Sequence, residues 1–239
     1  MRTKTFLILG FIFALALFLR AFILSDVPYG FHSDEVVAGY EGAFILRNGI
    51  DTYGNFLPLY FDKFGDFRPI GSILISGFFN LVFGPSVFAA RIGISLIGAF
   101  FVFVIYKLYL EIYGREAKRI GASAAAFFVA ILPWHVALSR STQESIVGMS
   151  TICLGVVFLF GYLKTNGKNY LLLSLFFLVI SYFFYTAHRL LIPLVLSGVF
   201  LQYFVGGGGK KDLRKLGIIV AAFFVLFFVF LASPWGSGR

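Results

Sequence analysis

The stretch TFLILGFIFALALFLRAFIL, residues 5–24, decides the fold class of this chain. It is close to the 20 or so apolar residues that a helix needs to cross about 30 Å of hydrocarbon. Comparable runs recur along the 239 residues, of which 59% are hydrophobic and 13% charged, against about 25% charged in soluble domains. No barrel-like alternation occurs, so the spans must be helices that satisfy their own backbone. We predict an all-α, polytopic transmembrane bundle forming one domain over residues 1–239.

The first apolar run is interpreted as a retained signal anchor. It follows Arg2 and Lys4, as a signal peptide would, but it is long and lacks a small-residue cleavage site. The net charge of +9 could suggest nucleic acid as a partner. In a membrane protein, however, the placement of Lys and Arg reports topology first, and we predict no nucleic-acid partner.

Seven spans and one shorter apolar run are predicted. The spans cover 5–24, 86–106, 119–138, 145–163, 170–187, 190–205 and 216–232. As one helix, residues 170–205 would be about 54 Å long, so they are divided at YTAHR into two helices joined by a tight hairpin. The shorter run, 70–84, would reach only about 22 Å as a helix. We interpret it as a re-entrant or interfacial helix.

The distribution of basic residues gives the predicted orientation. If 70–84 does not cross, twelve basic residues lie inside: Arg2, Lys4, Lys107, Arg115, Lys118, Arg119, Lys164, Lys168, Lys210, Lys211, Arg214 and Lys215. Ten of these would move outside if it did cross, against the positive-inside bias. We therefore expect a multi-pass protein of the cell membrane with a cytoplasmic N-terminus and a large outer loop, 25–85. Residues 206–215, GGGGKKDLRK, are predicted to be a flexible cytoplasmic linker.

The outer loop is predicted to contain an amphipathic helix over 34–47, capped by Ser33 and Asp34. Its apolar face is assigned to Val36, Tyr40 and Ala43. Acids in a first helical turn favour the positive end of the helix dipole, and this alone could explain Asp34 and Glu35. Because capping needs only one acid, a catalytic role is the alternative.

Other ionisable residues gather on the same predicted side of the membrane. They are Asp66, Arg68, Arg91, His135, Arg140, Glu144, His188 and Arg189. Charged groups at membrane depth are costly and usually line a cavity, although each arginine alone could be a headgroup anchor. The three histidines, His32 included, form no i, i+3 or i, i+4 ligand pair, and Cys153 is alone in a span. We predict no metal site and no cofactor, with a divalent cation left open.

Four segments of the sequence resemble one family. They are GFHSDEVVAGYEGAFILRNGIDTYGNFLPLYFDKFGDFRPIGSILI (30–75), FAARIGISLIGAF (88–100), PWHVALSRSTQES (133–145) and YTAHRLLIPL (185–194). Together they resemble membrane-embedded GT-C glycosyltransferases of the protein mannosyltransferase and aminoarabinose transferase type, over about residues 15–200. Family members generally have more spans and often a soluble C-terminal domain, so we interpret the chain as an N-terminal fragment. Where some relatives carry a later Asp, this sequence has Glu144.

The resemblance implies transfer of a sugar, with inversion, from a polyprenyl-phosphate donor to a protein, lipid or glycan acceptor at the outer face of the membrane. It assigns Asp34 as general base, with Glu35 positioning it or binding acceptor. An inverting transfer also needs a cationic group for the departing phosphate, for which arginine's planar fork is suited. Arg68 and Arg189 are the predicted phosphate ligands and Lys63 a weaker one. The remaining predicted substrate-binding residues are Asp66, Glu144 and His32.

Two other function classes remain open on the sequence alone. A transporter or flippase of lipid-linked sugars would favour ionisable residues at span midpoints and paired discontinuous helices, neither of which is visible. A non-catalytic, truncated membrane module is not rejected by any motif. Membrane lipids are expected partners in every case.

Overall fold

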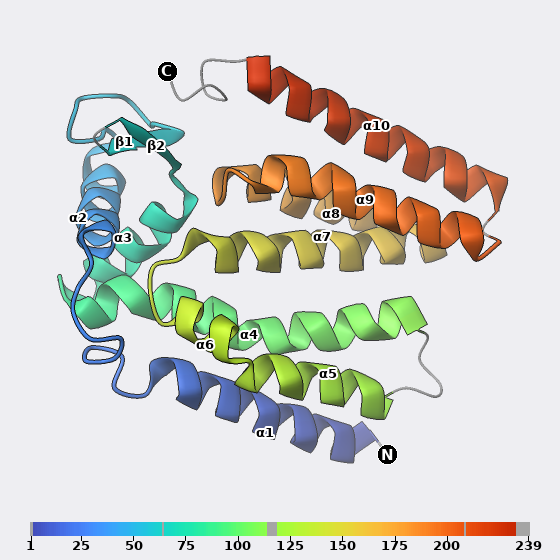
Figure 1. Cartoon of the computed structure of the whole chain (residues 1–239), viewed down its shortest axis with the longest axis horizontal. Helices are drawn as coiled ribbons and strands as arrows, with labels where there is room; N and C mark the ends of the chain where they lie inside the picture. Colours follow the sequence, from blue (N-terminus) through green and yellow to red (C-terminus); the bar gives the residue numbers. More distant parts are fainter. Residues whose placement is uncertain (1, 64, 114–118, 208, 233–239) are drawn as a thin grey trace.

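The computed structural model is a bundle of long helices with a smaller cap at one end (Figure 1). It describes residues 2–63, 65–113, 119–207 and 209–232. The bundle contains α1 (Arg2–Ala21), α4 (Val87–Tyr113), α5 (Arg119–Ile131), α6 (Pro133–Ser139), α7 (Glu144–Thr165), α8 (Lys168–Ile180), the 3-10 turn η1 (Ser181–Phe183), α9 (His188–Val205) and α10 (Lys210–Ala232). The cap, residues 22–86, contains α2 (Ser33–Asn48), the antiparallel hairpin β1 (Tyr60–Lys63) and β2 (Asp66–Pro69), and α3 (Gly71–Phe83).

The helical membrane bundle is confirmed, but the count of seven spans is not. Within the described residues, five helices are long and apolar enough to cross a membrane, and a sixth is reached if α5 and α6 form one bent span. The predicted span 170–187 is shorter than expected because α8 ends at Ile180 and continues only as η1. Its 13 residues rise about 20 Å. The division of 170–205 into two helices is confirmed, and 70–84 forms the short helix α3.

The break between α5 and α6 is caused by a proline and stabilised by a buried arginine. Pro133 has no N–H, and Leu132 before it adopts an extended conformation, with a bend of 57° between the helices. Arg20 of α1 donates to the backbone carbonyls of Ala130 (2.9 Å) and Val129 (3.1 Å) near the break and to Nδ1 of His135 (2.8 Å). Backbone groups freed within a membrane need such partners. The neighbouring contacts among α1, α4 and α5 use small residues, Ala16, Ala99, Ala126 and Ala130, all fully buried.

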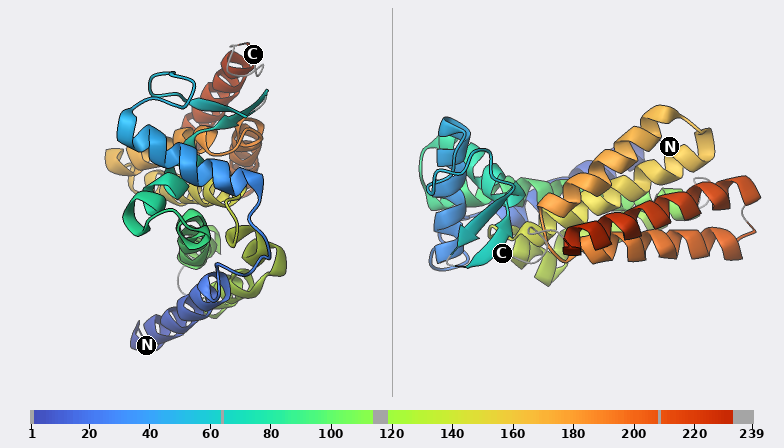
Figure 2. Two further views of the ribbon diagram at one scale, coloured as in Figure 1. Left: turned by 90° about the vertical axis from the view of Figure 1, so that its left-hand side faces the viewer. Right: turned by 90° about the horizontal axis from the view of Figure 1, so that it is seen from above.

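Basic residues gather at the end of the bundle opposite the cap. The ends of α4, α7 and α9 and the starts of α5, α8 and α10 all lie at that end (Figures 1 and 2). There, Glu111 is paired with Lys107 at 2.9 Å and with Lys164. Arg115 and Lys118 lie outside the described residues. The predicted linker 206–215 is partly wrong, because α10 begins at Lys210 and only the glycines before it connect the helices.

Within the cap, α2 packs on α3 and runs across the ends of the long helices (Figures 1 and 2). The predicted helix is present, but its cap residue is not Ser33 or Asp34. Nδ1 of His32 accepts from the backbone N–H of Asp34 at 3.2 Å, and Glu35 accepts from the N–H of His32 at 3.1 Å, which forms a capping box.

The face of α2 that packs against the protein is not the predicted apolar face. Val36 and Tyr40 are exposed, whereas the buried face carries Ala38, Gly39, Gly42 and Ile45. This face meets α3 at very short range: a Cβ on Gly42 would lie 2.0 Å from the carbonyl oxygen of Ile73, and one on Gly77 2.1 Å from the backbone of Gly42. Glycine is required at these positions because the two backbones are in contact. The spacing of apolar residues in the sequence does not reveal such a contact.

This contact leads to a test of the cap. Gly42→Ala is expected to destabilise the protein by about 1–3 kcal/mol or more, because the added methyl meets backbone rather than a movable side chain. Apparent unfolding temperature in detergent measures the effect. Gly10→Ala in α1 is the matched control, since nothing lies within 4 Å of its Cβ position, and it should be neutral or slightly stabilising. Equal behaviour of the two variants would contradict the close packing of α2 on α3.

Candidate active site

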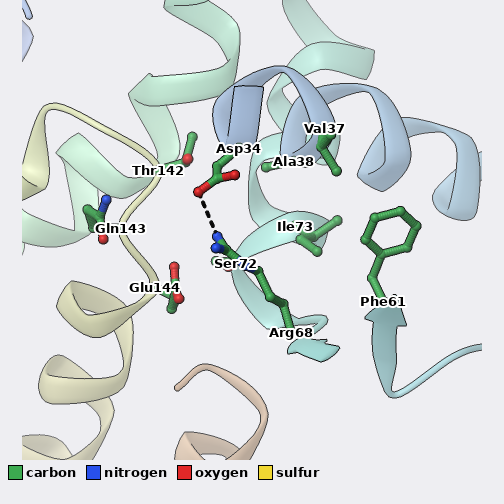
Figure 3. Close-up of a pocket in the computed structure, with 10 residues that line it drawn as sticks. All are labelled: Asp34, Val37, Ala38, Phe61, Arg68, Ser72, Ile73, Thr142, Gln143 and Glu144. Atoms are coloured by element: carbon green, nitrogen blue, oxygen red, sulfur yellow. Dashed lines mark hydrogen bonds and ion pairs between the residues drawn. The ribbon is translucent and has the colours of Figure 1, made fainter. Parts of the chain in front are cut away.

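A small pocket in the cap brings together an acid and a base from distant parts of the sequence. Nη1 of Arg68 donates to Oδ2 of Asp34 at 2.9 Å, and both side chains are about one third exposed, at 33% and 28% (Figure 3). Glu144 lies across from this pair, with Thr142 and Gln143 beside it (Figure 3). The remaining lining residues are Val37, Ala38, Phe61, Ser72 and Ile73.

Three separate elements position these groups. Asp34 is in the first turn of α2, and Arg68 is in β2, where it pairs with Phe61 of β1 in the hairpin register. The connection between α6 and α7 supplies Thr142, and Glu144 begins α7. The enclosed space is about 30 Å³, room for roughly two or three waters.

Glu35 faces away from this pocket and forms a buried ion pair. Its two oxygens accept from Nε (2.8 Å) and Nη2 (2.7 Å) of Arg91, and the side chains are only 6% and 1% exposed. Arg91 also donates to the carbonyls of Leu24 (3.1 Å), Pro28 (3.0 Å) and Gly30 (2.6 Å). All five guanidinium N–H groups thus have acceptors. The pair fixes the segment that leads into α2 and thereby the position of Asp34.

His32 is on the surface, and its side chain accepts a hydrogen bond from the backbone at the start of α2. Its Nδ1 lies 3.6 Å from Oδ2 of Asp34, a contact that would be an ion pair only if the ring were protonated. The same nitrogen accepts a hydrogen bond from the N–H of Asp34, which requires it to carry no proton. We therefore assign His32 as the cap of α2, with a ring that is 72% exposed.

Arg189 is buried beside the hairpin rather than in the pocket lining. It donates to the hydroxyl of Tyr60 in β1, and its guanidinium lies 5.1 Å from the Tyr60 ring centre and 5.2 Å from that of Phe230 in α10. Burial raises the pKa of Tyr60 above its usual value, although the charge of Arg189 opposes this. Tyr60 thus stays a neutral phenol at physiological pH, and the contact connects the strand pair that carries Arg68 to α9.

The other predicted residues have different surroundings. The side chains of Lys63 and Asp66 lie outside the described part of the structure, although their backbones pair in the hairpin. Arg140 donates to the carbonyls of Leu19, Phe22 and Val27, and His188 lies 3.1 Å from the hydroxyl of Ser181. Arg91, Arg140 and Arg189 are all buried with protein partners, so the headgroup-anchor interpretation is wrong for them.

Sequence reasoning missed Tyr60, Ser72, Thr142 and Gln143 in this region. Uncharged polar residues in a loop carry no distinctive spacing. The one available signal was the position of Thr142 and Gln143 immediately before the acid Glu144. Among the described residues, no cluster of three or more His, Cys, Asp or Glu side chains is arranged to hold a metal ion.

A comparison with protein families shows the family of this chain. A sequence model described as dolichyl-phosphate-mannose-protein mannosyltransferase matches residues 68–235, more than half of the chain. The chain belongs to this family. A search of curated proteins found no match. The GT-C resemblance stated from the motifs is thereby confirmed, and this member of the mannosyltransferase family is a multi-pass membrane glycosyltransferase.

The matched region of this mannosyltransferase-family member begins at Arg68 and includes Glu144 and Arg189. Asp34 and Glu35 precede it in the sequence. Of the charged residues that line the pocket, Asp34 therefore precedes the matched region, whereas Arg68 and Glu144 lie within it. The description of the family names a sugar, mannose, that is carried on a polyprenyl phosphate.

Proposed function

We propose that the protein transfers a sugar from a polyprenyl-phosphate donor to a hydroxyl of a protein, lipid or glycan acceptor, with inversion, at the outer face of the cell membrane. The observation that carries this proposal is the ion pair between Asp34 and Arg68 in the pocket between the cap and the bundle. Family membership favours a transferase over a transporter or a non-catalytic module.

Each of the two side chains has one task in a single displacement. The carboxylate of Asp34 takes the proton of the acceptor hydroxyl while that oxygen forms a bond to the anomeric carbon. The bond from this carbon to the phosphate oxygen breaks, and polyprenyl phosphate leaves with the electron pair. The phosphate is already a good anion, so no second acid is needed, unlike in glycoside hydrolysis. Arg68 stabilises the negative charge that develops on the phosphate.

The neighbouring residues support these roles by position. Glu35 and Arg91 fix the start of α2 and hold Asp34 at the pocket, and Arg189 supports the hairpin through Tyr60. Glu144 and Gln143 lie on the opposite wall, where an acceptor would enter. Lys63, Asp66 and His32 remain predicted substrate contacts. No metal or other cofactor enters this proposal.

The outer orientation is supported by the separation of charges. Basic helix ends lie at one end of the bundle and the cap, with its acidic residues, at the other (Figures 1 and 2). The positive-inside rule places the basic end in the cytoplasm. The donor phosphate would then meet Arg68 at the outer water–lipid boundary. Access of a membrane-impermeant thiol reagent to a cysteine placed at exposed Asp26, in intact cells, tests this orientation.

The proposed reaction is tested with membranes that contain the full chain. A panel of labelled polyprenyl-phosphate sugars, carrying mannose, glucose or aminoarabinose, is supplied, and both free polyprenyl phosphate and labelled acceptor are measured. Equal release and transfer, with inverted configuration in the product, is the expected result. Transfer from a nucleotide sugar, with every lipid-linked donor unused, would contradict the proposal.

Arg68 offers a direct test of phosphate binding. Arg68→Gln is expected to lower kcat/KM for the donor about tenfold to a hundredfold, because a charge-assisted contact contributes roughly 1.5–3 kcal/mol. Arg68→Lys should retain more of kcat/KM for the donor than Arg68→Gln but less than the unchanged chain, since a lysine keeps the charge but not the planar fork. The apparent unfolding temperature should change little, as the pair with Asp34 is partly exposed. Full activity of Arg68→Gln would remove Arg68 from this role.

A further inference from the structure

A second groove lies on the opposite side of α2 from Asp34. Its volume is about 750 Å³, within the range of roughly 300–1,000 Å³ of ligand sites. Successive residues of a helix are rotated by about 100°, so Val36, Tyr40 and Arg47 point away from Asp34 and Ala38. The groove is bordered by this face of α2, by the end of α3 and by the start of α4, and most of its lining is apolar.

The polar groups of the groove fit an anion. Arg47, at the end of α2, is exposed and forms no ion pair with any described residue, whereas Arg68 and Arg91 are both paired with acids. Asn80 is 7% exposed; its Oδ1 accepts from the N–H of Ser86 at 3.3 Å, and no described residue accepts from its Nδ2. No Asp or Glu is among the described lining residues. The groove thus presents hydrogen-bond donors and one positive charge beside an apolar surface.

The position of α2 indicates which anion is available. The helix runs across the ends of the long helices (Figures 1 and 2), so in a membrane it lies along the surface, where headgroups meet acyl chains. The groove includes Pro85, Ser86 and Val87, at the point where α4 enters the bundle. Three apolar side chains of the groove are exposed at the depth of the membrane surface: Phe31 (37%), Val36 (45%) and Tyr40 (65%).

We propose that this groove binds a bilayer phospholipid with an anionic headgroup. Arg47 binds the headgroup phosphate, and Asn80 supplies a further donor to the oxygens of the glycerol esters. One acyl chain lies against Phe31, Val36 and Val87. The site is separate from the pocket of Asp34 and does not depend on the proposed transfer reaction. A lipid held here would fix α2 at the membrane surface, as interfacial helices with apolar and basic faces generally bind.

The test uses the full chain purified in a neutral detergent, with lipid binding followed by native mass spectrometry and by apparent unfolding temperature. The probes are phosphatidylglycerol and phosphatidylcholine with identical acyl chains. We expect tighter binding and greater stabilisation by phosphatidylglycerol. Arg47→Gln should weaken phosphatidylglycerol binding about fivefold, the effect of roughly one basic residue at a lipid surface. It should weaken phosphatidylcholine binding less, because the choline ammonium already offsets the charge of that lipid's phosphate.

Two further variants and one competing lipid make the outcome decisive. Arg214→Gln, an exposed arginine near the opposite end of the bundle, should not change binding. Ala43→Trp, which fills the apolar part of the groove, should weaken binding of both phospholipids. Equal binding of the two phospholipids to the unchanged chain, or equal effects of Arg47→Gln and Arg214→Gln, would overturn the proposal. Displacement of phosphatidylglycerol by a polyprenyl phosphate at lower concentration, dependent on Arg47, would also overturn it by assigning the groove to a prenyl lipid.

Discussion

Asp34→Asn is expected to lower sugar transfer by a factor of about a hundred or more, within the 10²–10⁴ range for loss of a general base. Asparagine keeps the size of the side chain and can still accept a hydrogen bond from Arg68, but it cannot take a proton from the acceptor. The lost ion pair is partly exposed, so little stability is lost with it. The measurement is release of polyprenyl phosphate per folded molecule, with unfolding temperature recorded beside it.

Asp26→Asn is the matched control for this variant. Asp26 is an exposed acid of the same cap, outside the lining of the pocket, and its loss should leave transfer unchanged. If Asp34→Asn transfers sugar at the rate of the unchanged chain, Asp34 is not the base, and its place in the first turn of α2 is explained by the helix dipole alone. Glu144→Gln would then be examined, since Glu144 is the other carboxylate of the pocket.

The long helices were predictable from the sequence because apolar length is itself the physical requirement for crossing a membrane. The errors concern helices whose ends depend on backbone chemistry. Pro133 divides one predicted span into α5 and α6, and α8 ends early in η1. Lys210–Lys215 were assigned to a linker because charge and glycine suggest flexibility, yet they begin α10, where Lys215 is paired with Asp212 at 3.0 Å.

The candidate site was only partly predictable for a different reason. Asp34, Arg68 and Glu144 were singled out as charged residues in resembling motifs, and the structure places all three around one pocket. Two adjacent acids can have different roles that the sequence does not distinguish. Asp34 faces the pocket, whereas Glu35 is buried against Arg91. The partners of Glu35 are Arg91, 56 residues away in the sequence, and the backbone N–H of His32, and neither contact has a sequence signature.

Arg91→Met is expected to destabilise the protein by about 3–5 kcal/mol, because it leaves the Glu35 carboxylate buried without its partner. For a chain of this size that corresponds to a fall of roughly 6–20 °C in unfolding temperature. Transfer should fall as well, since Arg91 fixes the carbonyls of Leu24, Pro28 and Gly30 that lead into α2. Arg119→Met, at the start of α5 and without a described ion pair, is the control and should have a small effect.

A double variant distinguishes a structural ion pair from an acceptor-binding role for Glu35. Glu35→Leu combined with Arg91→Met removes both charges, so it should be less destabilised than the sum of the single variants. The double variant should still be less stable than the unchanged chain, because the carbonyls of Leu24, Pro28 and Gly30 lose their donor, Arg91. If Glu35 instead binds the acceptor, Glu35→Gln would raise KM for the acceptor at an unchanged unfolding temperature, and Arg91→Met would have no larger effect on stability than Arg119→Met. If the pair is structural, Arg91→Met should lower the unfolding temperature much more than Arg119→Met does. Transfer should then fall only in proportion to the fraction of molecules in which the start of α2 is displaced.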